Sequence, residues 1–468
     1  MDEIELDVIK HGDCLDLLRD LDADSIDLIV TDPPYGISFM GKDWDRALPP
    51  TEVWSECLRV LKPGAFAFVM CGPRQDVLAR MIIRLENAKF QMGFTSVFWA
   101  YATGFPKSIN IAKAIDRRAG IEPEVVGART GPDGRCRTLE PSGGKDRPGL
   151  HDGGIRNRTE MVTKPVSEEA RRFEGSYGGY QPKPVVELIL VCMKPISEDT
   201  FTEQALKNGH GITWLDDGRI PISTDELEKM KDNRKANRTI RAGPVAAGYG
   251  MKPEGLINSE QHEGGRFAPN LLVEDDVLDD GKIRKSSGGN TIRGKESKVS
   301  EWGYKEFHMA GYGDEGGFSD FFSLDRWWDR HGWATLDDNV KDTFPYFIVP
   351  KPSREEKEKG LEQFEERACR GSYEDSSQFG LLEKIQNSPR PKARNIHPTV
   401  KPIKLMSYLI TIGSRMNDVI LDPFVGSGTT AIAAKRLSRR YIGFELDEEY
   451  HRIATARLQA ESSAMDWF

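Results

Sequence analysis

The sequence predicts an α/β fold: a doubly wound, mostly parallel seven-stranded sheet with helices on both faces and an irregular inserted region. Three observations predict it. Buried-strand patterns alternate with helical patterns over residues 26–101 and again over residues 402–459. A glycine-rich turn joins a strand to a helix near the end of the chain. Between these stretches, glycine, proline and charged residues crowd together and hydrophobic periodicity fades.

The first alternating stretch begins with a short apolar run. We expect buried strands at Ile26–Val30, Ala65–Cys71 and Phe94–Tyr101, because each is a short apolar run bounded by polar or turn-forming residues. Helical spacing of the apolar residues predicts helices at Thr51–Leu61 and Asp76–Asn87. A strand–helix–strand–helix–strand order is typical of a parallel sheet with crossover helices.

The second alternating stretch repeats this order after the irregular middle of the chain. The expected elements are a strand at Phe344–Val349, a helix at Pro402–Ile412, a strand at Val419–Leu421, a helix at Thr430–Leu437, a strand at Tyr441–Glu445 and a helix at Glu448–Gln459. The last four of these form a strand, a glycine-rich turn, a helix, a second strand and a second helix. This arrangement contains one βαβ unit.

The middle of the chain contains one clear strand pattern, at Val185–Met193. Its basic residues gather in three islands: Arg129, Arg135, Arg137, Lys145, Arg147, Arg156 and Arg158; Lys229, Lys231, Arg234, Lys235, Arg238 and Arg241; and Lys282, Arg284, Lys285, Arg293, Lys295 and Lys298. The net charge of −9 does not by itself indicate a nucleic-acid binder. The islands are either solvated loops or surfaces that face phosphates, and their shared position favours the second.

Composition excludes several classes of protein. No apolar stretch approaches the roughly 20 residues that span a membrane. The start of the chain, Met1-Asp2-Glu3, is acidic and has no apolar segment, so no signal peptide is expected. Six cysteines are scattered without a CxxC pair, and no histidine is spaced as a metal ligand. We therefore expect a cytoplasmic protein with reduced thiols, no metal site and no membrane partner.

The glycine-rich turn predicts a cofactor site. It reads Asp422-Pro423-Phe424-Val425-Gly426-Ser427-Gly428-Thr429. Glycines let the backbone approach a ligand, and an acid at the end of the next strand, Glu445, is placed to reach ribose hydroxyls. Asp422 would repel a pyrophosphate and attract a cationic amino group, which favours S-adenosyl-L-methionine (AdoMet) over a nicotinamide dinucleotide. A P-loop is excluded, and a purely structural turn is the alternative.

A second motif, Asp32-Pro33-Pro34-Tyr35, follows the first predicted strand. Its chemistry suits methylation of an exocyclic amine on a flat ring. The Asp32 carboxylate and the Pro33 carbonyl can accept hydrogen bonds from the amine, because two prolines fix the loop. Tyr35 offers a flat face to a base that has left the double helix. A proline-containing turn without chemistry is the alternative.

These residues resemble the AdoMet-dependent DNA amino-methyltransferases, which modify N6 of adenine or N4 of cytosine. The catalytic motif precedes the cofactor motif, as in the β group, whose order is a circular permutation of the usual one. The stretches that carry the resemblance, especially to phage and prophage members, are His11–Cys14, Thr31–Gly36, Gly104–Ser108, Gly265–Asn270, Asn395–Pro402 and Leu421–Thr430. The resemblance implies a permuted, Rossmann-like methyltransferase fold.

The resemblance also implies roles for individual residues. Asp13 and Cys14 would flank the AdoMet adenine, Lys401 would hold the methionine end, and Glu445 would bind the ribose. Phe424, Gly426, Ser427, Gly428 and Thr429 would wrap the methionine, with Asp422 before them and Asp447 as a further candidate. His397 either packs before Pro398 or lines the pocket.

The same resemblance implies a division of the chain. Residues 1–102 would be the catalytic half of the methyltransferase domain, 103–184 a glycine-rich basic insertion, and 185–199 a returning strand. Residues 200–342 would be the target-recognition region, and 343–468 the AdoMet-binding half. Double-stranded DNA is the expected partner, and a homodimer and a cognate restriction endonuclease are possible partners.

Adenine N6 is the expected target, because Asp at the position of Asp32 is the usual form in adenine enzymes of this family. A cytosine-N4 enzyme is the alternative in the same class. Two alternatives come from other classes: a DNA-binding protein with an inactive methyltransferase fold, and a nicotinamide-dependent oxidoreductase. The intact Asp32 motif disfavours the first, and Asp422 disfavours the second.

Overall fold

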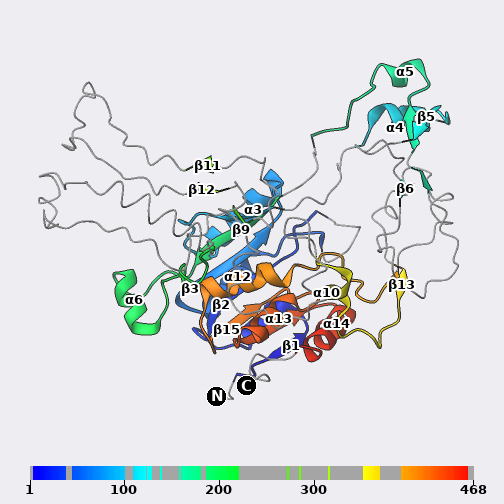
Figure 1. Ribbon diagram of the computed structural model, residues 1–468. Coiled ribbons are helices and arrows are strands. Elements are labelled where there is room, and N and C mark those ends of the chain that lie inside the picture. The colour runs from blue at the N-terminus through cyan, green and yellow to red at the C-terminus, as the bar shows by residue number, and fades with distance from the viewer. Residues whose placement is uncertain are drawn as a thin grey trace, which may run out of the picture. The chain divides into compact units, whose positions relative to one another are not determined.

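The computed structural model describes residues 4–37, 45–100, 109–122, 124–128, 138–139, 158–159, 161–180, 186–220, 271–272, 284–285, 315–316, 352–368 and 392–461 (Figure 1). The chain divides into two compact units. The first comprises Met1–Thr103, Val186–Asp375 and Lys392–Phe468, and the second comprises Gly104–Val185 and Ser376–Pro391. The predicted functional division of the chain stays a prediction.

The first unit is built on one large sheet. Its strands are β1 (Val8–His11), β2 (Ile26–Thr31), β3 (Leu61–Cys71), β4 (Val97–Ala100), β9 (Val186–Met193), β10 (Leu271–Leu272), β15 (Val419–Asp422) and β16 (Arg440–Glu445). Their order is β1-β16-β15-β2-β3-β9-β4-β10. Only β9 runs antiparallel to its neighbours within this sheet. The predicted doubly wound, mostly parallel sheet of seven strands is confirmed, and the two-residue β10 extends it at one edge.

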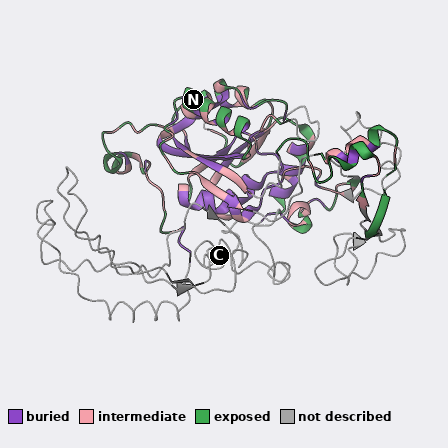
Figure 2. Ribbon diagram, turned by 90° about the horizontal axis from the view of Figure 1, so that it is seen from above, coloured by how far each residue is buried: buried purple, intermediate pink, exposed green. Residues whose placement is uncertain are grey.

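Helices cover both faces of this sheet. Within the described residues of this unit, the helices are α1 (Cys14–Arg19), α2 (Thr51–Val60), α3 (Gln75–Asn87), α6 (Phe201–Asn208), α10 (Arg354–Glu358), α12 (Ile403–Gly413), α13 (Thr429–Arg436) and α14 (Glu448–Gln459). Successive residues of β2 point to opposite faces. Leu28 packs with α12 and α13, whereas Ile29 packs with α2 and α3. Figure 2 shows the buried sheet between these layers.

The two ends of the chain meet at the centre of the sheet. β15 pairs with β2 in parallel, with Ile420 opposite Leu28 and Leu421 opposite Ile29. From this pair the chain winds in opposite directions, through α2 to β3 and through α13 to β16. A doubly wound sheet has a crevice at the carboxyl ends of its strands where the winding reverses. The site is therefore expected at the ends of β2 and β15.

The predicted elements within the described residues are all present, with boundaries that shift by four residues at most. The largest shift is in β3, which begins at Leu61 rather than Ala65, followed by β4, which begins at Val97 rather than Phe94. The structure adds β1, α1, α6 and α10, which the sequence patterns did not predict. β1 is an edge strand with mixed polarity, and pairing with β16 decides its conformation. The predicted strand at Phe344–Val349 lies outside the described residues.

The second unit contains regular structure where the sequence predicted an irregular insertion. Its elements are α4 (Ile111–Arg118), β5 (Glu124–Ala128), β6 (Thr138–Leu139), β7 (Arg158–Thr159), β8 (Met161–Lys164) and α5 (Glu168–Arg171). β5 pairs with β8 and β6 pairs with β7, both antiparallel. Asp116 of α4 accepts hydrogen bonds from the amide groups of Val166 and Ser167 at 2.7 and 3.0 Å. This carboxylate ties the two helices together across a long stretch of sequence.

Four further two-residue strands form two antiparallel pairs, β11 (Arg284–Lys285) with β12 (Glu315–Gly316) and β13 (Arg367–Ala368) with β14 (Lys392–Ala393). Nearly all residues of the three basic islands lie outside the described residues. Within the described ranges, no helix is long and apolar enough to cross a membrane. In the same ranges, no three His, Cys, Asp or Glu side chains are grouped to hold a metal ion.

Candidate active site

The two sequence motifs lie at the ends of neighbouring strands. Asp32 directly follows β2, and Asp422 is the last residue of β15. The preceding residue of β2, Thr31, donates a hydrogen bond of 2.6 Å from its hydroxyl to Oδ1 of Asp422, and both residues are buried. The roots of the two loops are thus joined side chain to side chain, although 390 positions separate Asp32 from Asp422 in the sequence.

Asp32 has a partner on each of its carboxylate oxygens. The Tyr35 hydroxyl donates to Oδ1 at 2.6 Å. The Lys401 ammonium forms an ion pair with Oδ2. Burial lowers the pKa of Lys401, but the Asp32 and Glu187 carboxylates outweigh that effect and raise it above its ordinary value. Lys401 is therefore a buried cation fixed on Asp32.

Glu187 of β9 completes this polar group. Its Oε2 lies 3.4 Å from the Tyr35 hydroxyl and 3.5 Å from Nζ of Lys401. Burial, together with the charges of Asp32 and Glu187, raises the pKa of Tyr35 well above its ordinary value. The phenol therefore stays neutral and acts as a hydrogen-bond donor. Lys401 also lies 5.9 Å from the centroid of the Tyr35 ring, within cation–π range.

A second carboxylate fixes the turn that follows the prolines. Asp45 is 2% exposed, and its Oδ1 accepts hydrogen bonds from the backbone amides of Tyr35 and Gly36 at 2.7 and 2.9 Å. Its Oδ2 lies 3.3 Å from the amide of Ile37. Gly36 has φ +68°, and a side chain there would meet the backbone amide of Leu48 at 2.8 Å. Asp45 thus holds three consecutive amides and sets the direction of Tyr35.

Asp422 is buried, and both of its carboxylate oxygens accept hydrogen bonds from the protein. Besides Thr31, the Thr430 hydroxyl donates to Oδ2 at 2.6 Å and the Phe424 amide donates to Oδ1 at 3.1 Å. Burial raises the pKa of Asp422 to about 6, despite these three donors. The carboxylate therefore joins β2, β15 and the start of α13. A direct contact of Asp422 with a cofactor amino group stays a prediction.

The glycine-rich loop is shaped by close contacts to its backbone. Gly426 has φ +56°, and a Cβ there would lie 2.8 Å from Nε2 of His397. His397 packs edge-on against Tyr450, with ring centroids 4.6 Å apart. Gly428 has φ +85°, and a Cβ there would lie 3.2 Å from Cα of Ala454. Both positions require glycine for backbone conformation as well as for space.

A buried arginine on α14 donates hydrogen bonds to the same loop. Arg457 of α14 is 2% exposed and donates to both the carbonyl and the hydroxyl of Ser427, the latter at 3.0 Å. Its other terminal nitrogen donates to the carbonyl of Glu356 at 3.2 Å. Burial lowers the pKa of Arg457 to about 10. Arg457 fixes Ser427 and was not among the predicted site residues.

The remaining predicted cofactor residues gather at the ends of β1 and β16. Register places His11 opposite Glu445, and the Gly12 amide donates to the Glu445 carbonyl at 2.9 Å. Asp13 begins α1 by accepting from the Leu15 amide at 2.8 Å, and half-buried Cys14 follows it. Burial raises the pKa of Glu445 to about 7.

Asp447 has a local structural partner. It begins α14, where its Oδ1 accepts from the amides of Glu449 and Tyr450 at 2.9 and 3.0 Å. Phe424 packs near α2, with its ring centroid 6.2 Å from that of Trp54 in this helix. Thr429 is buried at the first turn of α13. Pro33 is buried and Pro34 is half-buried.

The structure therefore brings the predicted residues together at the carboxyl ends of four consecutive strands, β1, β16, β15 and β2. It places Lys401 on Asp32, whereas the sequence resemblance implied contact with the methionine end of a cofactor, which stays a prediction. Sequence reasoning missed Glu187, Asp45 and Arg457. Glu187 carried a usable signal, because it is a lone acid in the apolar strand Val186–Met193. Asp45 and Arg457 carried none.

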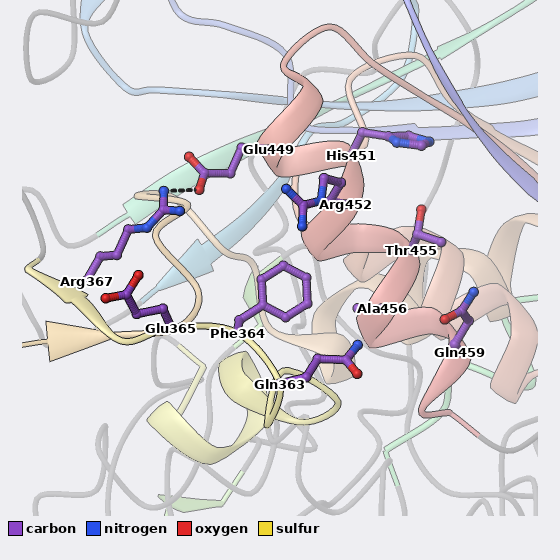
Figure 3. Close-up of a pocket in the computed structure, with 10 residues that line it drawn as sticks. All are labelled: Gln363, Phe364, Glu365, Arg367, Glu449, His451, Arg452, Thr455, Ala456 and Gln459. Atoms are coloured by element: carbon purple, nitrogen blue, oxygen red, sulfur yellow. Dashed lines mark hydrogen bonds and ion pairs between the residues drawn. The ribbon is translucent and has the colours of Figure 1, made fainter.

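A separate cavity of about 420 Å³ lies between the 363–367 segment and the outer side of α14 (Figure 3). An Arg367–Glu449 ion pair closes one end, and Phe364 faces Arg452 across it. None of the predicted site residues lines this cavity. It is therefore a different place in the unit from the crevice described above.

Comparison with known proteins agrees with this geometry. A family model described as DNA methylase, covering the N6 and N4 enzymes, matches residues 26–120 and 285–456, which is more than half of the chain. This chain belongs to the N6/N4 DNA methylase family. The matched residues include β2, β3, β15 and β16 and both motif loops.

Individual relatives match over shorter stretches. The type II methyltransferase M2.DpnII of Streptococcus pneumoniae is 53% identical over 66 residues, which is 14% of this chain and 25% of the relative. The type II methyltransferase M2.LlaDCHI of Lactococcus lactis subsp. cremoris is 52% identical over 62 residues, which is 13% of this chain and 23% of the relative. The chain thus spans about a quarter of the length of each.

Among solved structures, the PvuII DNA methyltransferase, described as cytosine-N4-specific, aligns over 96% of this chain and 85% of its own with a TM-score of 0.36 and 14% identity. The complex of M1.HpyAVI with SAM aligns over 96% of this chain and 98% of its own, with a TM-score of 0.35 and 15% identity.

Proposed function

We propose that the chain transfers a methyl group from AdoMet to the N6 amino group of adenine in double-stranded DNA, on a base turned out of the helix. One observation carries the proposal. Parallel pairing of β2 with β15 sets the Asp32 loop beside the glycine-rich loop, at the point where the winding of the sheet reverses. Membership of the N6/N4 DNA methylase family supports the same reaction class.

The residues of the crevice suit an AdoMet molecule. Gly426 and Gly428 adopt positive φ and so give the loop a tight turn directly after Asp422. Glu445 is a partly buried acid at a strand end, next to the strand that leads to Asp13, and is placed to accept from hydroxyl groups. AdoMet supplies an electrophilic methyl group when it is bound. Asp13, Cys14, Glu445 and the loop from Phe424 to Thr429 would hold it.

Asp32 accepts a hydrogen bond from the amino group of the target base. The nitrogen of an exocyclic amine is a poor nucleophile because its lone pair is delocalised into the ring. A hydrogen bond from the amine to a fixed carboxylate favours the tetrahedral nitrogen that reacts. Tyr35 and Lys401 hold both oxygens of Asp32 in place, and Asp45 holds the turn. The acceleration thus comes from positioning and from preorganised charge.

The target base is proposed from Asp32 itself, since Asp at this position is usual among adenine enzymes of the family. Methylation of cytosine N4 is the competing outcome. The proposed DNA substrate also fits the basic islands, which lie almost entirely outside the described residues. A homodimer, a restriction endonuclease partner and a cytoplasmic location stay predictions.

The test is nucleoside mass spectrometry of DNA from cells that express the protein in a host without its own DNA methylases. We expect N6-methyladenine in DNA from cells with the wild type and about a thousandfold less with Asp32→Ala. Asp22→Ala, at an exposed acid on the loop before β2, is the matched control and should methylate normally.

Each result decides between the alternatives. N4-methylcytosine alone would overturn the adenine assignment but keep the reaction class. Unmodified DNA, together with AdoMet binding in equilibrium dialysis, would favour an inactive DNA-binding protein. Dialysis should also show that Asp32→Ala binds AdoMet as the wild type does, because Asp32 acts on the amine.

A further inference from the structure

Four side chains from three separate segments form a closed ring of polar contacts at the end of β2. Asp32 touches Tyr35 through one oxygen and Lys401 through the other. Glu187, from the antiparallel strand β9, lies within 3.5 Å of both Tyr35 and Lys401 and closes the ring. The side chains of Asp32, Glu187 and Lys401 are 17%, 15% and 9% exposed. Water therefore screens their charges only weakly.

The ring carries an excess of negative charge. Lys401 is a cation, since the two carboxylates outweigh the effect of burial and raise its pKa. Tyr35 is neutral, because burial and the same carboxylates raise its pKa well above its ordinary value. Two carboxylates and one ammonium leave one negative charge over. Without Glu187, Lys401 would neutralise Asp32 and the ring would have no net charge.

We propose that Glu187 is a positioning residue that sets the charge of the site. Lys401 cancels the negative charge of Asp32, and Glu187 supplies one negative charge in its place. The inference rests on the proposed function. In that reaction the carbon–sulfur bond breaks as a carbon–nitrogen bond forms, and the positive charge of the sulfonium moves to the amine nitrogen. The methylated ammonium then releases its proton to water. Excess negative charge fixed beside the amine stabilises the positive charge as it arrives.

Glu187 also has a geometric part in this arrangement. Its Oε2 lies 3.4 Å from the Tyr35 hydroxyl and 3.5 Å from Nζ of Lys401, the two donors that contact Asp32. Its strand, β9, pairs with β3 on one side and β4 on the other, so the sheet fixes the backbone of Glu187. Gln at position 187 retains the shape and a hydrogen-bonding oxygen but removes the charge, so it separates the charge effect from the geometric one.

Single-turnover methyl transfer to DNA tests the proposal, measured at saturating AdoMet on the full-length protein. We expect Glu187→Gln to lower the rate about 100-fold with the dissociation constant for AdoMet unchanged. Glu187→Asp should regain part of the loss. Glu86→Gln, at an exposed acid of α3, is the matched control and should react as the wild type does.

A double variant distinguishes charge from structure. Glu187→Gln combined with Lys401→Met leaves Asp32 as the single charge and restores one negative charge to the site. It should react faster than Glu187→Gln alone, whereas a purely structural role predicts a further loss. A wild-type rate in Glu187→Gln, or a double variant no faster than that single variant, would overturn the inference. Failure of the wild type to methylate DNA would instead refute the proposed function.

Discussion

The two loops that meet at the crevice are held in place by different kinds of interaction. The Asp32 loop depends on charged side chains, one from nearby in the sequence and two from distant segments. Asp45 holds its amides, Lys401 pairs with its carboxylate, and Glu187 faces both the tyrosine and the lysine. The side chains that make these contacts are largely removed from water.

The glycine-rich loop depends mainly on shape. Gly426 and Gly428 adopt positive φ and lie against His397 and Ala454, where no side chain fits without displacement. One fold thus positions two neighbouring loops by different interactions: contacts of charged side chains hold the first loop, and steric fit holds the second. Changes of charge should act chiefly on the first loop, and changes of volume chiefly on the second. Three sets of substitutions test this division.

Gly426→Ala should distort the glycine-rich loop. The new Cβ would lie 2.8 Å from Nε2 of His397, and φ +56° disfavours alanine. Strain and overpacking together should lower the free energy of unfolding by about 3–4 kcal/mol and weaken AdoMet binding. Urea unfolding and equilibrium dialysis measure both.

The matched control for that variant is Gly93→Ala, where an added Cβ meets nothing within 4 Å. It should change stability little. Adding His397→Ala to Gly426→Ala should recover the steric part of the loss and leave the conformational part. Normal stability of Gly426→Ala would contradict a loop held by shape.

Asp422 tests whether charge matters at the root of the second loop. Burial raises its pKa from 3.8 to about 6, so the folded protein favours the protonated carboxyl. The wild type should therefore lose stability relative to Asp422→Asn as the pH rises from about 4 to about 7, by up to about 3 kcal/mol. Below pH 4 the two should differ by a constant amount. Unfolding free energies measured across this range check the prediction, and parallel curves for the two proteins would refute it.

Asp45→Asn tests the role of charge in the first loop, because it removes a charge with little change in volume. The loss of a charged acceptor for the Tyr35, Gly36 and Ile37 amides should cost about 1–2 kcal/mol of stability. We expect single-turnover methylation to fall about tenfold while AdoMet binding holds. Asp22→Asn serves as the exposed control. Equal losses in methylation and AdoMet binding would show that the two loops are not held independently.

The sequence predicted much of the fold and part of the site. Hydrophobic runs predicted β2, β3, β15 and β16, because parallel strands buried on both faces are apolar along most of their length. The antiparallel β9 was predicted in the same way, since it lies inside the same sheet and is largely apolar. The motifs around Asp32 and Gly426 were recognisable since each is local in sequence. Glu187 and Asp45 were missed, because their roles arise from contacts with residues 152 and 10 positions away. No local pattern records such contacts.

The amino-acid sequence alone determined most of the strands and helices of the large sheet and the short segments that carry the chemical groups, because hydrophobic period and turn residues act over a few positions. Only the tertiary structure decided that Lys401 pairs with Asp32, that Asp422 is enclosed between two threonine hydroxyls, and that Glu187 leaves the site with an excess negative charge. Those contacts depend on strand order and register, which bring segments hundreds of residues apart within hydrogen-bonding distance.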